Sequence, residues 1–190
     1  MLATLAPVDR FISDVRHAFE TETTMTCILA DTKKALERLL TDREAIAAFE
    51  RGDLRRGKVY TDPEHLFCVS VSVRDRGGAG QERRGVLHDH GELGWAVYGV
   101  LRGKVTMALY QRLDDGSVPG RAELRALPPV AQKDGEAVII PVGGIHSPHN
   151  ESEGPSCNIV IRSRDQATVW RNRYDAAAGT VERFNGASAC

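Results

Sequence analysis

The chain has 190 residues, of which 42% are hydrophobic and 27% charged, and its formal net charge is −1 at pH 7. This composition is typical of a globular domain with a sizeable hydrophobic core, and the near-neutral charge argues against nucleic-acid and membrane partners. Four scattered cysteines without a C-x-x-C pair, and no signal-peptide or membrane-span pattern, lead us to expect a cytoplasmic protein.

The first part of the chain predicts three amphipathic helices. Apolar residues recur at helical spacing from Val8 to Phe19. A second helix is expected to begin after Asp31 or Thr32 as the N-cap, and a third is expected over residues 43–50.

From residue 58 onward the pattern changes to short runs rich in β-branched residues. The expected strands cover residues 66–73, 86–90, 94–101, 104–111, 121–127, 137–140, 145–149 and 157–163, followed by a hairpin over 167–174 and 180–184. Many short strands indicate a closed or two-sheet β-barrel. We therefore predict one domain over residues 1–190, in which the helices of residues 1–57 pack on the outside of a barrel formed by residues 58–184.

Three histidines in the predicted barrel form a candidate metal site. His88 and His90 lie two residues apart in an expected strand, so their side chains point to the same face. A third imidazole, from His146 on a later strand, would complete a three-nitrogen site for one metal ion. Three protein ligands leave coordination positions open, as a catalytic metal requires.

The sequence around His146 resembles a known family motif. Its spacing is that of the second cupin motif, G-x5-P-x-G-x2-H-x3-N. The matching residues are Gly135, Pro141, Gly143, His146 and Asn150. The resemblance to the cupin superfamily covers roughly residues 60–170. It implies a mainly β fold, the double-stranded β-helix or jelly-roll barrel.

The run from His88 to His90 resembles the H-x-H core of the first cupin motif. The motif's usual glutamate ligand is missing, because Glu92 comes too early in the chain. A three-histidine set without a carboxylate is similar to the thiol dioxygenase branch, the relatives of cysteine dioxygenase. That resemblance implies a mononuclear Fe(2+) site, dioxygen and a small thiol as substrates, and a sulfinate as product.

The chain departs from cysteine dioxygenases where those enzymes handle their substrate. Their Tyr-Thr-Arg run is similar to Tyr60-Thr61-Asp62 here, where an acid replaces the arginine that binds the carboxylate of cysteine. Their Ser-x-His-x-Tyr triad keeps only its serine, Ser156. These differences favour a thiol acid other than cysteine as the substrate.

Several further side chains are candidates for the site. An arginine for the carboxylate would have to come from a late strand. The candidate substrate contacts are Arg162, Arg164, Tyr60 and Trp95, and the candidate catalytic residues are Tyr98, through its hydroxyl, and His149, near the mouth of the barrel. Asp89 should point away from the two histidines beside it, unless it fixes a ligand tautomer.

Two other functions fit the same ligands: an oxygenase or lyase that cleaves a carbon–carbon bond of a diketone-like or phenolic substrate, and a non-catalytic cupin that binds a metal or a small ligand. An arginine facing the metal would favour the thiol acid, and an apolar pocket would favour the diketone. A coordination sphere filled by Glu92 or His149 would favour the non-catalytic protein. The sequence leaves the oligomeric state open.

Overall fold

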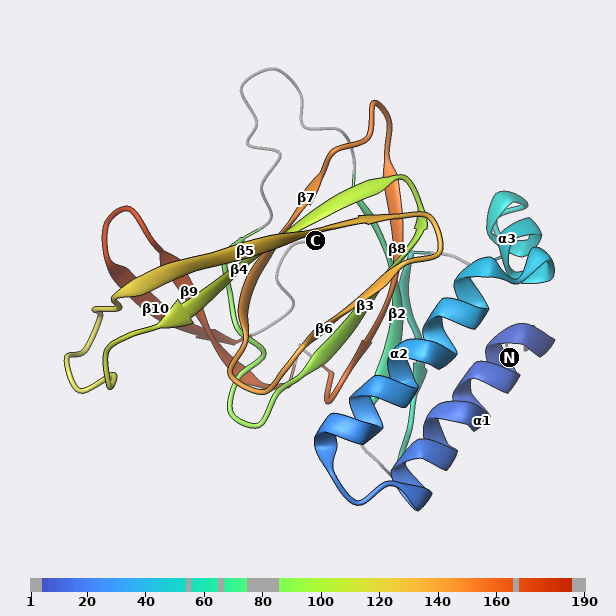
Figure 1. Ribbon diagram of the computed structural model, residues 1–190, viewed down its shortest axis with the longest axis horizontal. Coiled ribbons are helices and arrows are strands. Elements are labelled where there is room, and N and C mark those ends of the chain that lie inside the picture. The colour runs from blue at the N-terminus through green and yellow to red at the C-terminus, as the bar shows by residue number, and fades with distance from the viewer. Residues whose placement is uncertain (1–4, 54–55, 65–66, 75–85, 166–167, 186–190) are drawn as a thin grey trace.

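The computed structural model describes residues 5–53, 56–64, 67–74, 86–165 and 168–185, with three helices at the N-terminal end and antiparallel strands after them (Figure 1). The helices are α1 (Ala6–Thr21), α2 (Met25–Thr41) and α3 (Arg43–Glu50). The strands are β1 (Gly57–Thr61), β2 (Cys68–Arg74), β3 (Ala96–Arg102), β4 (Lys104–Arg112), β5 (Leu124–Lys133), β6 (Ala137–Ile140), β7 (Ile145–Asn150), β8 (Ser156–Arg162), β9 (Trp170–Asp175) and β10 (Thr180–Asn185).

Helix α2 begins earlier than the sequence predicted. The hydroxyl oxygen of Thr24 accepts a hydrogen bond from the Cys27 amide and caps the helix, so the N-cap is neither Asp31 nor Thr32. Thr32 instead lies fully buried in the middle of the helix. Ile28 is among the residues that extend the apolar stripe back towards this earlier cap.

The strands form two facing sheets. The first sheet has the order β1-β2-β8-β3-β6. In the second, β5-β4-β7 is continued by residues 86–90, called here the histidine segment, because His88 forms bridges with both His146 on β7 and Arg173 on β9. The hairpin of β9 and β10 completes this sheet.

This strand order confirms the expected double-stranded β-helix. From β2 to β8 the chain alternates between the sheets, with the histidine segment between β2 and β3, except at β4 and β5, which are neighbours in the second sheet. The first sheet thereby collects β2, β8, β3 and β6, and the second collects the histidine segment, β7, β4 and β5. That arrangement is a jelly roll.

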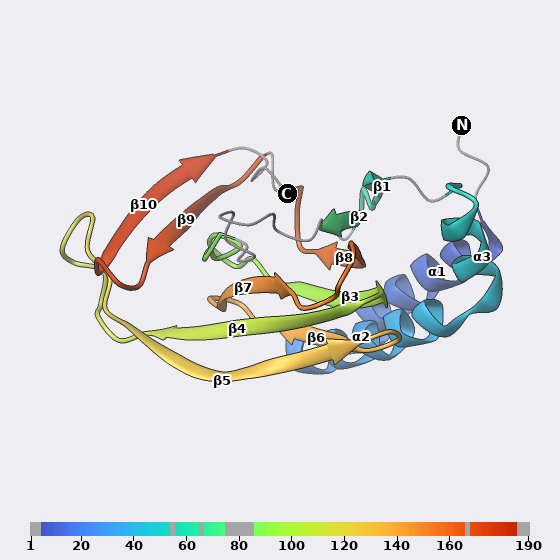
Figure 2. The same ribbon diagram turned by 90° about the horizontal axis from the view of Figure 1, so that it is seen from above.

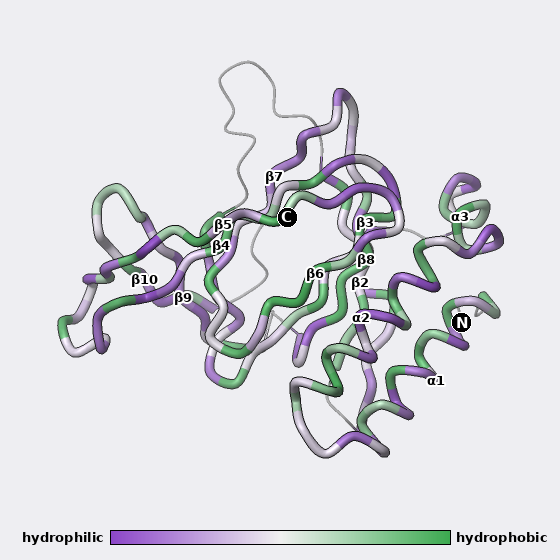
Figure 3. The backbone as a smooth tube through the Cα atoms, viewed as in Figure 1, coloured by the Kyte–Doolittle hydropathy of each residue, from purple (hydrophilic) through white to green (hydrophobic). Residues whose placement is uncertain are grey.

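The helices cover the outer face of the first sheet (Figure 2). Alternation along β3 divides its side chains between two cores. Val97 and Leu101 join the large core with the helices, whereas Ala96 and Tyr98 join a smaller core between the sheets. The residues of β3 and β6 are mostly hydrophobic, and those of β9 are mostly hydrophilic (Figure 3).

Strand β5 is longer than predicted because it continues through Pro128 and Pro129. Those two residues lie opposite the register shift between Met107 and Leu109 on β4, in the manner of a β-bulge. β5 is also the edge of its sheet, where a strand tolerates proline. Two expected strand starts, at residue 66 and at residue 167, lie outside the described residues. No helix in the described part of the chain combines the length and apolar character needed to span a membrane.

Candidate metal site

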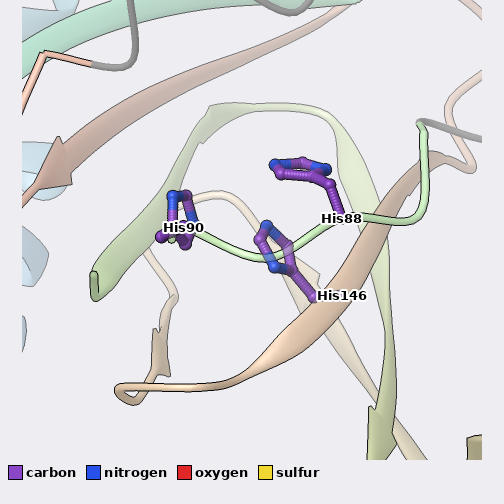
Figure 4. A group of neighbouring side chains, drawn as sticks. All are labelled: His88, His90 and His146. Atoms are coloured by element: carbon purple, nitrogen blue, oxygen red, sulfur yellow. The ribbon is translucent and has the colours of Figure 1, made fainter. Parts of the chain in front are cut away.

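His88, His90 and His146 lie between the sheets with their rings pointing toward one another (Figure 4). One ring nitrogen from each residue lies within 4.8 Å of those from the other two. The ring centroids are 4.5 Å apart for His88 and His146, 4.9 Å for His90 and His146, and 5.5 Å for His88 and His90. All three side chains are buried, and His146 is 0% exposed. The structure thus brings together the three predicted ligands.

Backbone hydrogen bonds hold the two histidine-bearing stretches side by side. The amide of His88 donates to the carbonyl of His146 at 3.1 Å, and the amide of His146 donates to the carbonyl of His88 at 3.0 Å. Before β7, the amide of Gly144 donates to Pro141 in a turn where Gly143 has φ of +74°, a conformation that favours glycine. Pro141 and Gly143 of the motif, together with Gly144, therefore form the turn that starts β7 and aims His146 inward.

The imidazoles of His88 and His146 are arranged to stay neutral. The Nδ1 of His88 lies 2.7 Å from the carbonyl oxygen of Val86, which only accepts hydrogen bonds, so Nδ1 carries the proton and Nε2 keeps a lone pair for a metal. Burial lowers the pKa of His88 to about 4, and the charges of Arg171 and Arg162 add to this effect. Burial likewise holds the pKa of His146 well below its usual range.

The cluster suits a divalent transition metal. Neutral imidazole is a common ligand for iron, zinc, copper and nickel. The Nδ1 atom of His146 is buried without a hydrogen-bond partner among the described residues, which marks the cluster as incomplete when only protein atoms are counted. Three ligands would leave coordination positions for a substrate.

Neither of the alternative fourth ligands belongs to the cluster. The side chain of Glu92 is exposed to solvent, and the metal-ligand group found among the described residues contains only the three histidines. His149 is half-buried and lies three residues after His146 on β7, at the opposite parity along the strand. His149 is therefore not a ligand, and its catalytic role near the mouth of the barrel stays a prediction.

Tyr98 and Arg162 extend the cluster within the barrel. The hydroxyl of Tyr98 lies 3.1 Å from Nε2 of His146, and the side chain is 4% exposed. The guanidinium carbon of Arg162 lies 5.4 Å from the centre of the Tyr98 ring. Arg162 also donates a hydrogen bond of 2.6 Å from Nη1 to the hydroxyl of Ser70 on β2. A tyrosine hydroxyl and a cation thus lie on one side of the histidines.

Tyr60 and Trp95 do not take the positions predicted for substrate contacts. The hydroxyl of Tyr60 donates to Asp62 at 2.8 Å and accepts from Arg16 of α1 at 3.0 Å. Trp95 belongs to the core beneath the helices, with its ring centre 6.0 Å from that of Phe19. Both side chains therefore pack on the helix-covered side. Trp95 precedes Tyr98 by three residues, and this odd spacing already placed the two on opposite faces.

Arg164 is likewise not brought to the histidines. It follows the last residue of β8 and is exposed to solvent, whereas Arg162 is 9% exposed. The acid at Asp62, noted as a departure from the cysteine dioxygenase pattern, is fully buried and pairs with Arg16 at 2.6 Å. It therefore lies on the side of α1 and does not oppose a substrate carboxylate at the histidines.

Sequence reasoning missed the partners that position these residues. Ser70 supports Arg162, and Asn172 and Tyr174 on β9 support Asp89, which points away from the neighbouring ligands as expected. Alternation along β2 indicated which face Ser70 occupies, but its partner Arg162 lies on the neighbouring strand β8, far away in the sequence. No local pattern indicated that β9 would pair with the histidine segment.

Comparisons with known proteins find similarity to solved structures only. No protein-family model matches the chain, and no curated protein matches it. Among solved structures, an oxalate oxidase in complex with glycolate is 18% identical over 52% of this chain and 42% of that chain, with a TM-score of 0.39. A Klebsiella pneumoniae protein with a double-stranded β-helix domain is 17% identical over 63% and 83% of the two chains, with a TM-score of 0.41. A mutant of Bacillus subtilis oxalate decarboxylase is 17% identical over 53% and 22%, with a TM-score of 0.38.

The chain thus spans less than half the length of the oxalate oxidase it resembles. Likenesses of this size do not determine a fold or an activity. The jelly roll described above therefore depends on the strand order, and the candidate site on the geometry of the histidines.

Proposed function

We propose that this chain is a cupin that holds one ferrous ion through His88, His90 and His146 and uses dioxygen to oxidise a small thiol acid to a sulfinate. The observation that carries the proposal is the convergence of three buried imidazoles from two distant stretches of chain. Overall, one thiol and one dioxygen give one sulfinic acid, so the four electrons lost by sulfur reduce both oxygen atoms.

The ligand set supports this chemistry through its charge. Three neutral imidazoles would leave a bound divalent metal with its full positive charge, and a charge of this kind would favour a thiol substrate in its anionic form. A bound ferrous ion would supply the one-electron chemistry that dioxygen requires. The protein contributes the burial of the three imidazoles, which keeps bulk water away from the reacting groups.

Arg162 supports an acid as the substrate. It carries a fixed positive charge on the barrel side of β8, beside the tyrosine that reaches His146. The carboxylate of a thiol acid could bind the guanidinium while its sulfur binds the metal. The hydroxyl of Tyr98 would then orient the reacting end of the substrate by a hydrogen bond. In this arrangement Arg162 selects the acid and Tyr98 positions it.

The apolar side chains between the sheets favour a second function. Met107, Val138, Ile140 and Val160 form the core next to Tyr98. An interior of this kind also accepts an uncharged diketone-like or phenolic substrate, whose carbon–carbon bond an oxygenase could cleave at the same ligands. The two candidates differ in whether Arg162 is needed.

Oxygen uptake by the iron-loaded protein tests both functions. We expect consumption of one dioxygen per thiol with a thiol acid, formation of a sulfinate, and little consumption with the matching thiol that lacks the carboxylate. Consumption with diketones alone would replace the first function by the second. No consumption with any of these compounds, despite one bound iron per chain, would favour a non-catalytic metal protein.

A further inference from the structure

The histidine segment is held from both sides, and one of those sides lies outside the jelly roll. Toward β7 it pairs with His146. Toward β9, the amide of Tyr174 donates to the carbonyl of Leu87 at 2.9 Å, and the amide of Asp89 donates to the carbonyl of Asn172 at 3.2 Å. The C-terminal hairpin is therefore the second support of the segment that carries two of the three imidazoles.

Several of the hydrogen bonds between the histidine segment and β9 are accepted by one side chain, the carboxylate of Asp89. It lies between His88 and His90, is 7% exposed, and points to the face opposite the metal site. Its oxygens accept hydrogen bonds from the amide of Asn172 at 2.9 Å, from the side-chain amide of Asn172 at 2.7 Å and from the hydroxyl of Tyr174 at 2.8 Å. The amide of Gly91 donates to the same carboxylate at 2.9 Å.

A second, independent feature ties the segment to β9. Gly91 directly follows His90 and has φ of +80°. A Cβ atom at this position would lie 2.4 Å from the carbonyl oxygen of Trp170, so no other residue fits without moving the backbone. The chain after His90 thus rests against the start of β9.

We propose that β9, acting through Asp89, positions His88 and His90 and thereby sets the affinity of the three-histidine site for its metal. Because Asp89 is locked on the outer face, the backbone rotation that aims the two imidazoles inward is fixed before a metal binds. Asn172 and Tyr174 are positioning residues for the site although neither belongs to the histidine cluster. This inference rests on the proposed metal site, but it makes a separate claim about what controls affinity.

The chain offers a matched control. The hydroxyl of Tyr60 also donates to a buried aspartate, Asp62, and the distance is 2.8 Å, as it is for Tyr174 and Asp89. Tyr174→Phe therefore removes a hydrogen bond to a buried aspartate, and Tyr60→Phe removes the equivalent bond together with the one that its hydroxyl accepts from Arg16. Only the first bond belongs to the proposed support of the metal site. A purely structural effect would change both variants alike.

The experiment is a titration of the metal-free proteins with Co(II), followed by its visible absorption, together with melting temperatures measured without metal. We expect the Kd for Co(II) to rise roughly tenfold in Tyr174→Phe, the size of effect that loss of an outer-shell partner produces. We expect a similar rise in Asn172→Ala, which serves if Tyr174→Phe does not fold. In Tyr60→Phe we expect the wild-type Kd.

Three results would overturn the inference. The first is a lower melting temperature in Tyr174→Phe with an unchanged Kd, because the bond would then be structural only. The second is an equal rise of Kd in Tyr60→Phe, because affinity would then follow overall stability. The third is a wild-type protein that binds no Co(II). That result removes the metal site itself, whereas the first two leave it intact.

Discussion

Two buried polar clusters, on opposite faces of the first sheet, differ in whether their members satisfy one another. On the helix-covered side, Asp62 accepts hydrogen bonds from Arg16 at 2.6 Å, Tyr60 at 2.8 Å and the amide of Glu64 at 2.9 Å. Between the sheets, the three histidines bring ring nitrogens within 4.8 Å of one another, and no acid among the described residues joins this group. Burial, followed by the charges of His88, His90 and Arg162, lowers the pKa of His146.

This difference indicates that one cluster stabilises the fold and the other binds a ligand. The Asp62 cluster pairs opposite charges and needs nothing from outside, so it stabilises the fold. The histidine cluster gathers groups of one kind, and Nδ1 of His146 finds no partner in the described part of the chain. A buried polar group that the protein leaves incomplete costs free energy, and such positions occur where a ligand completes them.

The largest expected effect comes from removing a ligand. His146→Leu should weaken metal binding by more than about 100-fold, above the loss expected from an outer-shell partner. The melting temperature of the metal-free protein should stay the same or rise, because a buried polar ring is replaced by an apolar side chain of similar size. Metal titration and thermal unfolding check the two parts. Metal affinity that survives this change would show that the cluster is not the site.

Replacing the cation beside Tyr98 should change substrate selection. Arg162→Met should lower kcat/KM for a thiol acid by about 100-fold, because a charge-assisted pair with the carboxylate is lost. The same variant should leave the rate with a thiol lacking the carboxylate unchanged. Arg164→Met, two residues further and exposed, is the control and should behave as wild type. Equal losses with both substrates would assign Arg162 to the fold.

Disrupting the satisfied cluster should affect stability alone. Asp62→Asn should lower the free energy of unfolding by about 2 kcal/mol, because a charged acceptor of three hydrogen bonds becomes neutral. In a chain of this length that corresponds to a fall of roughly 4–8 °C in melting temperature. Metal affinity should not change. A loss of metal binding here would contradict the separation of the two clusters.

The smallest expected effect concerns a single hydroxyl. Tyr98→Phe should lower kcat/KM roughly tenfold, the equivalent of one hydrogen bond, while its ring continues to pack between the sheets. Steady-state oxygen uptake measures this effect, and the melting temperature serves as the check on packing. A rate equal to that of wild type would mean that the hydroxyl contacts only His146 and not the substrate.

Most of this fold could be predicted from the sequence because its strands can be recognised from short stretches of residues. The segment Ala137–Ile140 agrees residue for residue with β6, since short apolar runs between turns define strands well. Tertiary context decided the rest. α2 starts at Met25, after its cap Thr24, because the helix extends its apolar stripe over the first sheet. β5 passes through Pro128 and Pro129 because it is an edge strand with an irregular register.

The metal site was predicted better than its surroundings for a similar reason. The spacing of His88, His90 and His146 relative to turn glycines can be seen directly in the sequence. The partners of Asp89 cannot be seen in this way. Asn172 and Tyr174 lie more than 80 residues away, on a hairpin that reaches the histidine segment only when the second sheet is assembled. Trp95 and Tyr98 were both predicted at the site, although strand parity would have separated them. Parity could not show that Tyr60 would meet Arg16.

X-ray absorption spectroscopy of the iron-loaded protein tests the central claim most directly. We expect one iron per chain, with the scattering pattern of three imidazoles and with light atoms in the remaining positions. Addition of a thiol acid should replace light-atom scattering by that of sulfur. Iron bound without imidazole scattering, or no iron bound by the folded protein, would contradict it.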